Sequence, residues 1–157
     1  LLMHLRGQPK QTVVLIDEAH LLPDDSLEDL RLLTADNFDR QSPFSLVLVG
    51  QPLLRARLAE PRHYALWQRI GVRLRLRPLS EDEVQRFVDR HLKAAGYRKK
   101  SSLFEPAAVA ELFHPSRGIP RLVQNIALDG MLEAMAAKKT KVDAEAISQA
   151  IIDMEAE

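Results

Sequence analysis

The stretch TVVLIDEAH, residues 12–20, places a β-branched, apolar run directly before two adjacent carboxylates. A short, continuous run of this kind predicts a strand of a parallel sheet that is buried on both faces. Sheets of this class bind ligands beyond the carboxyl ends of their strands, which is where Asp17 and Glu18 would stand. In nucleotide hydrolysis, one such acid holds Mg²⁺ through water and the other orients the attacking water. The competing interpretation is a helix-capping carboxylate beside a solvated neighbour.

The rest of the first half continues the alternation of strands and helices. A helix is predicted to begin at residues 23–25, and Gly50 with Pro52 begins another helical stretch after a second buried strand at residues 45–49. Asp, Asn, Ser and Pro mark a loop around residues 36–43. The segment VRLRLR, residues 72–77, alternates strictly and predicts a third strand near an edge or a cleft.

The second half changes to a helical pattern. Ser80 and Glu83 form a predicted capping box, and the apolar spacing that follows is helical. Further helices are predicted near residues 106–113, 119–137 and 143–154. The sequence therefore predicts an α/β part, residues 1–78, followed by an all-helical part, residues 79–157.

Composition bounds the class of protein. The 157 residues include 46% hydrophobic and 28% charged residues, as expected for a globular chain. Lys and Arg total 22 and Asp and Glu total 22, so no global field attracts nucleic acid or an anionic membrane. There is no cysteine, and no apolar run approaches the roughly 20 residues of a membrane span. We expect a cytoplasmic chain without an integral membrane segment, and the apolar, Met-less beginning suggests a piece of a longer protein.

A phosphate-binding loop is missing from the sequence. Such a loop has the pattern G-x-x-x-x-G-K-[ST], whose backbone N–H groups and lysine hold the phosphates. None of the six glycines precedes a lysine, and no two of them have the required spacing. By itself, this polypeptide is therefore expected to bind ATP poorly or not at all, with the loop expected in a preceding segment.

Five phrases in order carry a family resemblance: VVLIDEAHLL, LEDLRLLT, LVLVGQPLLRARL, LWQRIGVRLRLRPLSEDEV and RGIPRLVQNIALDGMLEA. Together they resemble AAA+ ATPases of the ExeA type, found in general secretion, and transposase helpers such as TniB and MuB. The match runs from about Thr12 to the C-terminus and lacks the Walker A portion. It implies a partial P-loop NTPase fold: a three-layer α/β core with a parallel sheet, followed by a helical lid.

The resemblance implies roles for five residues, with ATP and Mg²⁺ as cofactors. Asp17 and Glu18 correspond to the Walker B pair, and Asp17 holds Mg²⁺ through water. Gln51 corresponds to sensor 1, Arg69 to the arginine finger inserted into a neighbouring subunit, and Arg121 to sensor 2 in the lid.

Each role has an ordinary alternative. Gln51 also suits a polar turn, Arg69 also suits a solvated helix end, and Arg62 and Arg73 compete for the finger role. His20 is interpreted mainly as a polar residue at a helix start, with a role like that of a helicase coupling residue as the alternative. Without the Walker A strand, the strands at 45–49 and 72–76 should leave a gap, pair directly, or recruit a strand from another chain.

The implied function is coupling of ATP binding and hydrolysis to assembly on a partner. The expected partners are the protein's own subunits in a homo-oligomer, and either transposase and DNA or components of the secretion machinery, with a slight preference for transposition. One alternative is a non-catalytic protein-interaction module on the same scaffold. Another is a nucleic-acid-binding protein, which the neutral charge disfavours. A DEAH helicase is disfavoured because a second RecA-like domain is missing.

Overall fold

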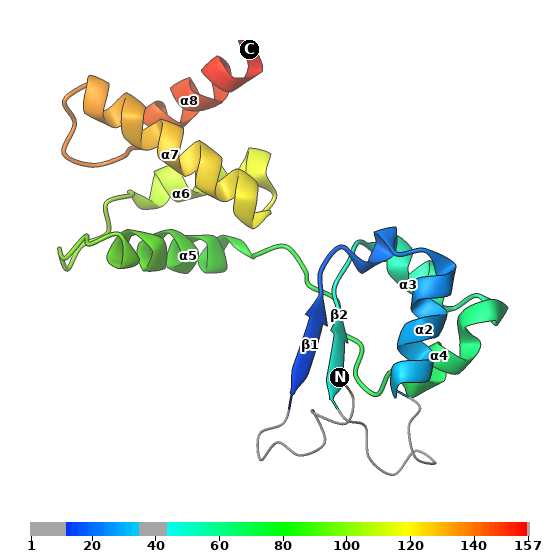
Figure 1. The fold of residues 1–157 in the computed structure, drawn as a ribbon. Helices are drawn as coiled ribbons and strands as arrows, with labels where there is room; N and C mark the ends of the chain where they lie inside the picture. The colour runs from blue at the N-terminus through cyan, green and yellow to red at the C-terminus, as the bar shows by residue number, and fades with distance from the viewer. Residues whose placement is uncertain (1–11, 35–43, 157) are drawn as a thin grey trace. The chain divides into compact units, whose positions relative to one another are not determined.

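The computed structural model describes residues 12–34 and 44–156 (Figure 1). They form two compact units, one ending at Leu74 and the other beginning at Arg75. The division predicted after residue 78 falls in the same irregular stretch, residues 70–80. The predicted breaks at Gly7 and Pro9 and the predicted loop at 36–43 lie outside the described residues.

The first unit contains a pair of parallel strands, as predicted. Strand β1 (Val13–Ile16) pairs with β2 (Ser45–Leu48), with Val13 opposite Ser45 and Ile16 opposite Leu48. Helix α2 (Asp24–Thr34) connects them and begins with two acidic residues that suit its positive end. The remaining elements of the unit are η1 (Ala19–Leu21), α3 (Pro52–Leu58), η2 (Pro61–His63) and α4 (Tyr64–Arg69).

The strand pair is covered on one face. Figure 1 shows α2, α3 and α4 on the same side of β1 and β2. The core there is built around Ala19, Leu27, Leu54, Leu58 and Leu66. On the opposite face, Val13 and Leu15 are 61% and 63% exposed. The prediction of strands buried on both faces is therefore wrong for the described residues of the first unit, because α2, α3 and α4 of this unit lie on one side of the strands.

The predicted third strand is also wrong. Residues 72–77 have no regular secondary structure, and Val72, Leu74 and Leu76 are 76%, 88% and 91% exposed. A strand needs a neighbour to satisfy its backbone hydrogen bonds. Within the described part of the chain, the sheet consists of β1 and β2 alone, so residues 72–77 have no neighbouring strand to pair with. Direct pairing of residues 72–76 with β2 is thus absent there.

The second unit is a four-helix assembly, as predicted. Its helices are α5 (Glu81–Ala94), α6 (Pro106–Ser116), α7 (Pro120–Ala136) and α8 (Ala144–Ala156). They enclose a core centred on Val84, Leu112, Val123 and Ile147, all completely buried. The order of an α/β part followed by a helical part is confirmed. Among the described residues, we find no helix with the length and hydropathy that a membrane span requires.

Helix α5 starts at the predicted capping box. The Ser80 backbone N–H donates to Glu83 Oε2 at 2.9 Å. Arg77 donates to both oxygens of the same carboxylate, at 2.7 and 2.9 Å. The Arg77 guanidinium, followed by the Ser80 N–H, lowers the pKa of Glu83 to about 2. The start of the helical unit is therefore fixed by charged and neutral hydrogen bonds to one side chain.

Candidate functional site

The two predicted acids lie together at the carboxyl end of β1. Both are exposed, and the Glu18 backbone N–H donates to Asp17 Oδ1 at 2.8 Å. Glu18 has φ 51° and ψ 30°, a left-handed conformation that residues other than glycine seldom adopt. The chain turns there from β1 into η1 (Figure 1). The turn presents both carboxylates to solvent at the edge where a parallel sheet binds ligands.

The turn after β2 lies beside this pair. The Ala19 N–H donates to the Val49 carbonyl at 2.8 Å, which extends the strand pairing by one step. The Gln51 N–H points to His20 Nδ1 at 3.5 Å, and the same nitrogen lies 3.3 Å from Glu18 Oε2. The first unit thus brings together Asp17, Glu18 and Gln51.

His20 is the residue of this site whose contacts the sequence does not predict. Its side chain is only 8% exposed and lies between Glu18 and the turn at Gln51. The contact with Gln51 spans 31 positions along the chain. The one feature of the sequence that points to this contact is the position of His20, two residues after Glu18 at the end of a predicted strand.

A charged cluster supports the segment behind the site. Asp24 accepts from Arg57 and Arg62 at 2.5 Å each, and His63 Nε2 lies 3.0 Å away. The Arg57 and His63 hydrogen bonds lower the pKa of Asp24. Arg57 also donates to the His20 carbonyl at 2.7 Å. The cluster therefore connects α2, α3 and η2 to the turn that carries the acids.

The acids suit a magnesium ion better than a metal bound entirely by protein. Among residues 12–34 and 44–156, no group of three or more His, Asp or Glu side chains is arranged to hold a metal. Mg²⁺ in nucleotide sites commonly takes one or two carboxylates, with phosphates and water as the other ligands. Asp17 fits that donor set as a single protein ligand. The phosphate cradle is missing from the sequence.

Arg69 is the last residue of α4 and is exposed. The two arginines that compete with it in the sequence have contacts within the first unit: Arg62 binds Asp24, and the Arg73 guanidinium lies 4.0 Å from the Trp67 ring centroid. Arg73 also donates to the Trp67 carbonyl at 2.7 Å. The end of α4, which carries Arg69, lies apart from the carboxyl ends of the strands (Figure 1).

Arg121 is exposed in the first turn of α7, in the helical unit. The sharp helix start predicted there is confirmed: Pro120 is the first residue, after Arg117 and Gly118 at φ 48° and 70°. A Cβ on Gly118 would lie 1.9 Å from the Leu79 carbonyl oxygen. Glycine is therefore required at this turn, which sets the direction of the helix that carries Arg121.

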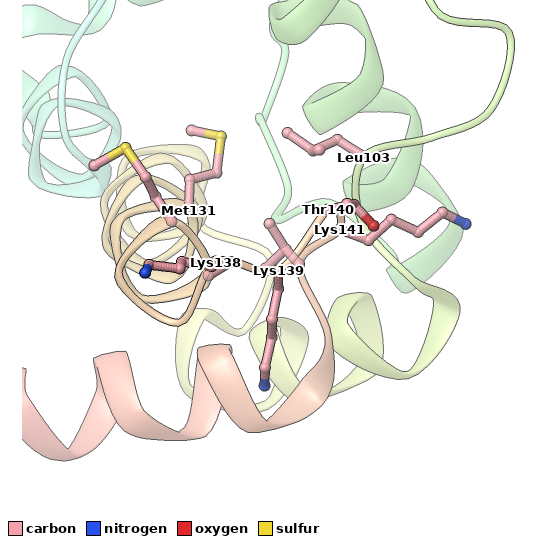
Figure 2. A pocket seen from close by; sticks show the side chains of 9 residues that line it. Leu103, Met131, Lys138, Lys139, Thr140 and Lys141 are labelled. Carbon is pink, nitrogen blue, oxygen red and sulfur yellow. The ribbon is translucent and has the colours of Figure 1, made fainter.

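The helical unit also has a shallow pocket of about 360 Å³ at the end of α7. Figure 2 shows its labelled side chains, among them Met131, Lys138 and Lys139. Lys139 is bound to Asp143 and Glu145, at 2.8 and 2.7 Å. None of the five predicted site residues lines this pocket.

Comparisons with known proteins connect these observations. Residues 1–58 match the family described as AAA domain. General secretion pathway protein A of Aeromonas hydrophila is 41% identical over 134 residues, which cover 85% of this chain and 24% of that protein. The chain thus spans about a quarter of the length of this relative.

Solved structures agree on the fold. The RuvB Holliday junction branch migration motor of Thermotoga maritima matches with a TM-score of 0.71 and 21% identity, over 95% of this chain and 46% of that one. A second RuvB structure from the same organism gives 0.72 and 21%, with the same two coverages. At this identity, the likeness concerns the fold only. Together, the AAA-domain match over residues 1–58, the 41% identity and the fold support an AAA+ fragment similar to general secretion pathway protein A.

Proposed function

We propose that the chain contributes the hydrolytic acids and the lid of an ATP site in a longer AAA+ protein. The observation that carries this proposal is the arrangement of Asp17, Glu18 and the Gln51 turn at the carboxyl ends of two paired parallel strands. In the proposed site, Asp17 holds Mg²⁺ through water and Glu18 polarises the attacking water. Gln51 contacts the terminal phosphate or that water as sensor 1.

Two arginines complete the proposed site from other places. Arg69, at the exposed end of α4, acts as the finger on the nucleotide of a neighbouring subunit. An arginine in this role contributes roughly 10³ to 10⁵ in rate. Arg121 reads the nucleotide from the lid. The expected assembly is therefore a homo-oligomer, with hydrolysis moving the lid against the core.

For the partner, we place secretion before transposition. The support is the 41% identity to a protein named for general secretion, while the RuvB likeness concerns the fold alone. Transposase and DNA remain the alternative partners. DNA stimulation of ATP turnover in the longer protein would favour transposition, and stimulation by a secretion component without DNA would favour secretion.

A non-catalytic interaction module is the second candidate. It is favoured by the missing phosphate-binding loop, since the 157 residues contain no G-x-x-x-x-G-K-[ST]. A longer form of the protein that also has no such loop, and that binds no ATP, would establish the module.

The test compares carboxylate variants in a longer form that carries the loop. We expect Asp17→Asn to raise the Mg²⁺ concentration needed for turnover, and Glu18→Gln to abolish turnover. Asp25→Asn is the matched control, because Asp25 is an exposed carboxylate eight positions from Asp17 in the same unit. If Asp17→Asn and Glu18→Gln both keep the activity of the Asp25→Asn control, the proposed site is rejected.

A further inference from the structure

His20 joins two turns that the proposed function uses separately. Its Nδ1 lies 3.3 Å from Glu18 Oε2 and 3.5 Å from the Gln51 backbone nitrogen. The imidazole is 8% exposed, whereas the Glu18 side chain is 62% exposed. A buried ring therefore anchors an otherwise solvated carboxylate to the turn after the neighbouring strand.

The ring is held in this place by the backbone around it. Arg57 fixes the His20 carbonyl, and the Ala19 N–H is bound to the Val49 carbonyl. A Cβ on Gly50 would lie 3.1 Å from His20 N and 3.4 Å from its Nδ1. The small residue at position 50 thus allows the turn after β2 to approach the ring closely.

One ring nitrogen cannot serve both neighbours at once. A neutral imidazole has one N–H donor and one acceptor nitrogen. With the proton on Nδ1, the ring presents an N–H toward Glu18 Oε2, which lies 3.3 Å away. With the proton on Nε2, Nδ1 accepts from the Gln51 N–H and no longer presents an N–H toward Glu18. A shift of the Gln51 turn and a change in the anchoring of Glu18 are therefore linked through the tautomer of His20.

We propose that His20 is a positioning residue that orients the Glu18 carboxylate and couples that orientation to the turn at Gln51. The proposal rests on the proposed hydrolytic role of Glu18. Orientation matters because a misplacement of about 1 Å at a reacting group costs on the order of 10²-fold in rate. Glu18 is exposed and stands in a left-handed turn, and His20 limits the positions of its carboxylate.

The coupling is tested first in this chain, without nucleotide, by NMR of the His20 ring nitrogens and the Gln51 amide. Glu18→Gln removes the anion that favours a proton on Nδ1. The nitrogen chemical shift of Nδ1 should therefore move toward the value of an unprotonated acceptor nitrogen, and the signal of the Gln51 amide should shift with it. The His63 ring, which faces Asp24, is the internal control and should not change. Unchanged His20 and Gln51 signals in Glu18→Gln would overturn the coupling.

The positioning role is tested in the longer, loop-containing protein with two variants of His20. His20→Phe keeps a ring to fill the buried space, and we expect kcat to fall about 10-fold with KM for ATP unchanged. His20→Asn supplies an amide near the place of Nδ1 and should restore kcat to within about 3-fold. His114→Asn, at an exposed histidine, is the matched control.

The outcomes separate this inference from the proposed function. If Glu18→Gln leaves turnover intact, the proposed function fails, whatever the His20 variants do. If Glu18→Gln abolishes turnover while His20→Phe retains full kcat, only the positioning role fails. Far-UV circular dichroism of His20→Phe checks folding, and equal kcat of the Phe and Asn variants below that of the wild type would also overturn the role.

Discussion

Replacing Gly118 with alanine tests the packing that fixes the start of α7. A Cβ at this position would lie 1.9 Å from the Leu79 carbonyl oxygen and 2.9 Å from its nitrogen. The φ of 70° adds strain for any L side chain. Because backbone atoms block the space, relief requires moving the segment around Leu79, whose N–H donates to the Gly118 carbonyl at 2.8 Å.

The magnitude follows from three contributions. The left-handed backbone costs about 1 kcal/mol. Losing the Leu79 hydrogen bond costs about 1 kcal/mol. Partial withdrawal of the half-buried Leu79 from the core costs about 1 kcal/mol more. We therefore expect Gly118→Ala to destabilise the helical unit by about 3 kcal/mol, which lowers the melting temperature of a unit this size by roughly 12 to 24 °C.

Alanine substitutions at two other glycines distinguish the cost of backbone strain from the cost of steric overlap. Gly96 has φ 101° and no atom within 4 Å of the position that a methyl group would take, so Gly96→Ala should cost only about 1 kcal/mol. Gly71 has neither strain nor neighbours, so Gly71→Ala should be nearly neutral. Methyl NMR signals of Ile147 report unfolding of the helical unit, while fluorescence of Trp67, the one tryptophan, reports the first unit. Equal loss in Gly118→Ala and Gly96→Ala would refute the overlap.

Three further predictions concern particular residues. Arg77 and the Ser80 N–H lower the pKa of Glu83 from 4.5 to about 2, so the stabilisation of the helical unit by the Glu83 carboxylate is complete above pH 4.5 and is lost as pH falls toward 2. The free energy of unfolding in urea should therefore change less between pH 5 and pH 3 in Glu83→Gln than in the wild type. An identical change in both proteins would contradict this role. Leu27 is fully buried and Leu21 is 73% exposed, so Leu27→Ala should destabilise the first unit by about 2 to 5 kcal/mol and Leu21→Ala by less than about 0.5 kcal/mol. Similar decreases in the free energy of unfolding for the two variants, followed by Trp67 fluorescence, would contradict the assignment of Leu27 to the core. Residues 72–77 have no strand partner among the described residues, so their amides should exchange with solvent as fast as those of an unfolded peptide; protected amides at Leu74 and Leu76 would indicate pairing in solution.

The helical unit is predictable from the sequence because its signals are local. The Ser80 and Glu83 box and the repeat of Val84 and Val88 lie within single helix turns, and they mark α5 without knowledge of the rest of the fold. Strand pairing depends on partners distant in sequence. The residues at 72–77 do alternate, yet no described strand lies beside them to complete a ladder.

In the candidate site too, features set by neighbouring residues are predictable and contacts between residues distant in sequence are not. The apolar run directly before Asp17 and Glu18 predicts that they follow a strand, and β1 ends there. The contact of His20 with the Gln51 turn is not predictable in this way, because it depends on the register of β1 against β2 and on the close approach at Gly50. The spacing of residues along the chain reveals neither the register of the strands nor this close approach.

The most direct test of the central claim is a paired measurement on Glu18→Gln in the longer protein that carries a phosphate-binding loop. ATP affinity and single-turnover hydrolysis are measured on the same preparation. We expect the variant to bind Mg²⁺ and ATP as tightly as the wild type and its hydrolysis to fall by at least about 10²-fold, because only the residue that polarises the attacking water is changed. Hydrolysis at the wild-type rate with bound ATP would contradict the claim that Glu18 belongs to the hydrolytic site.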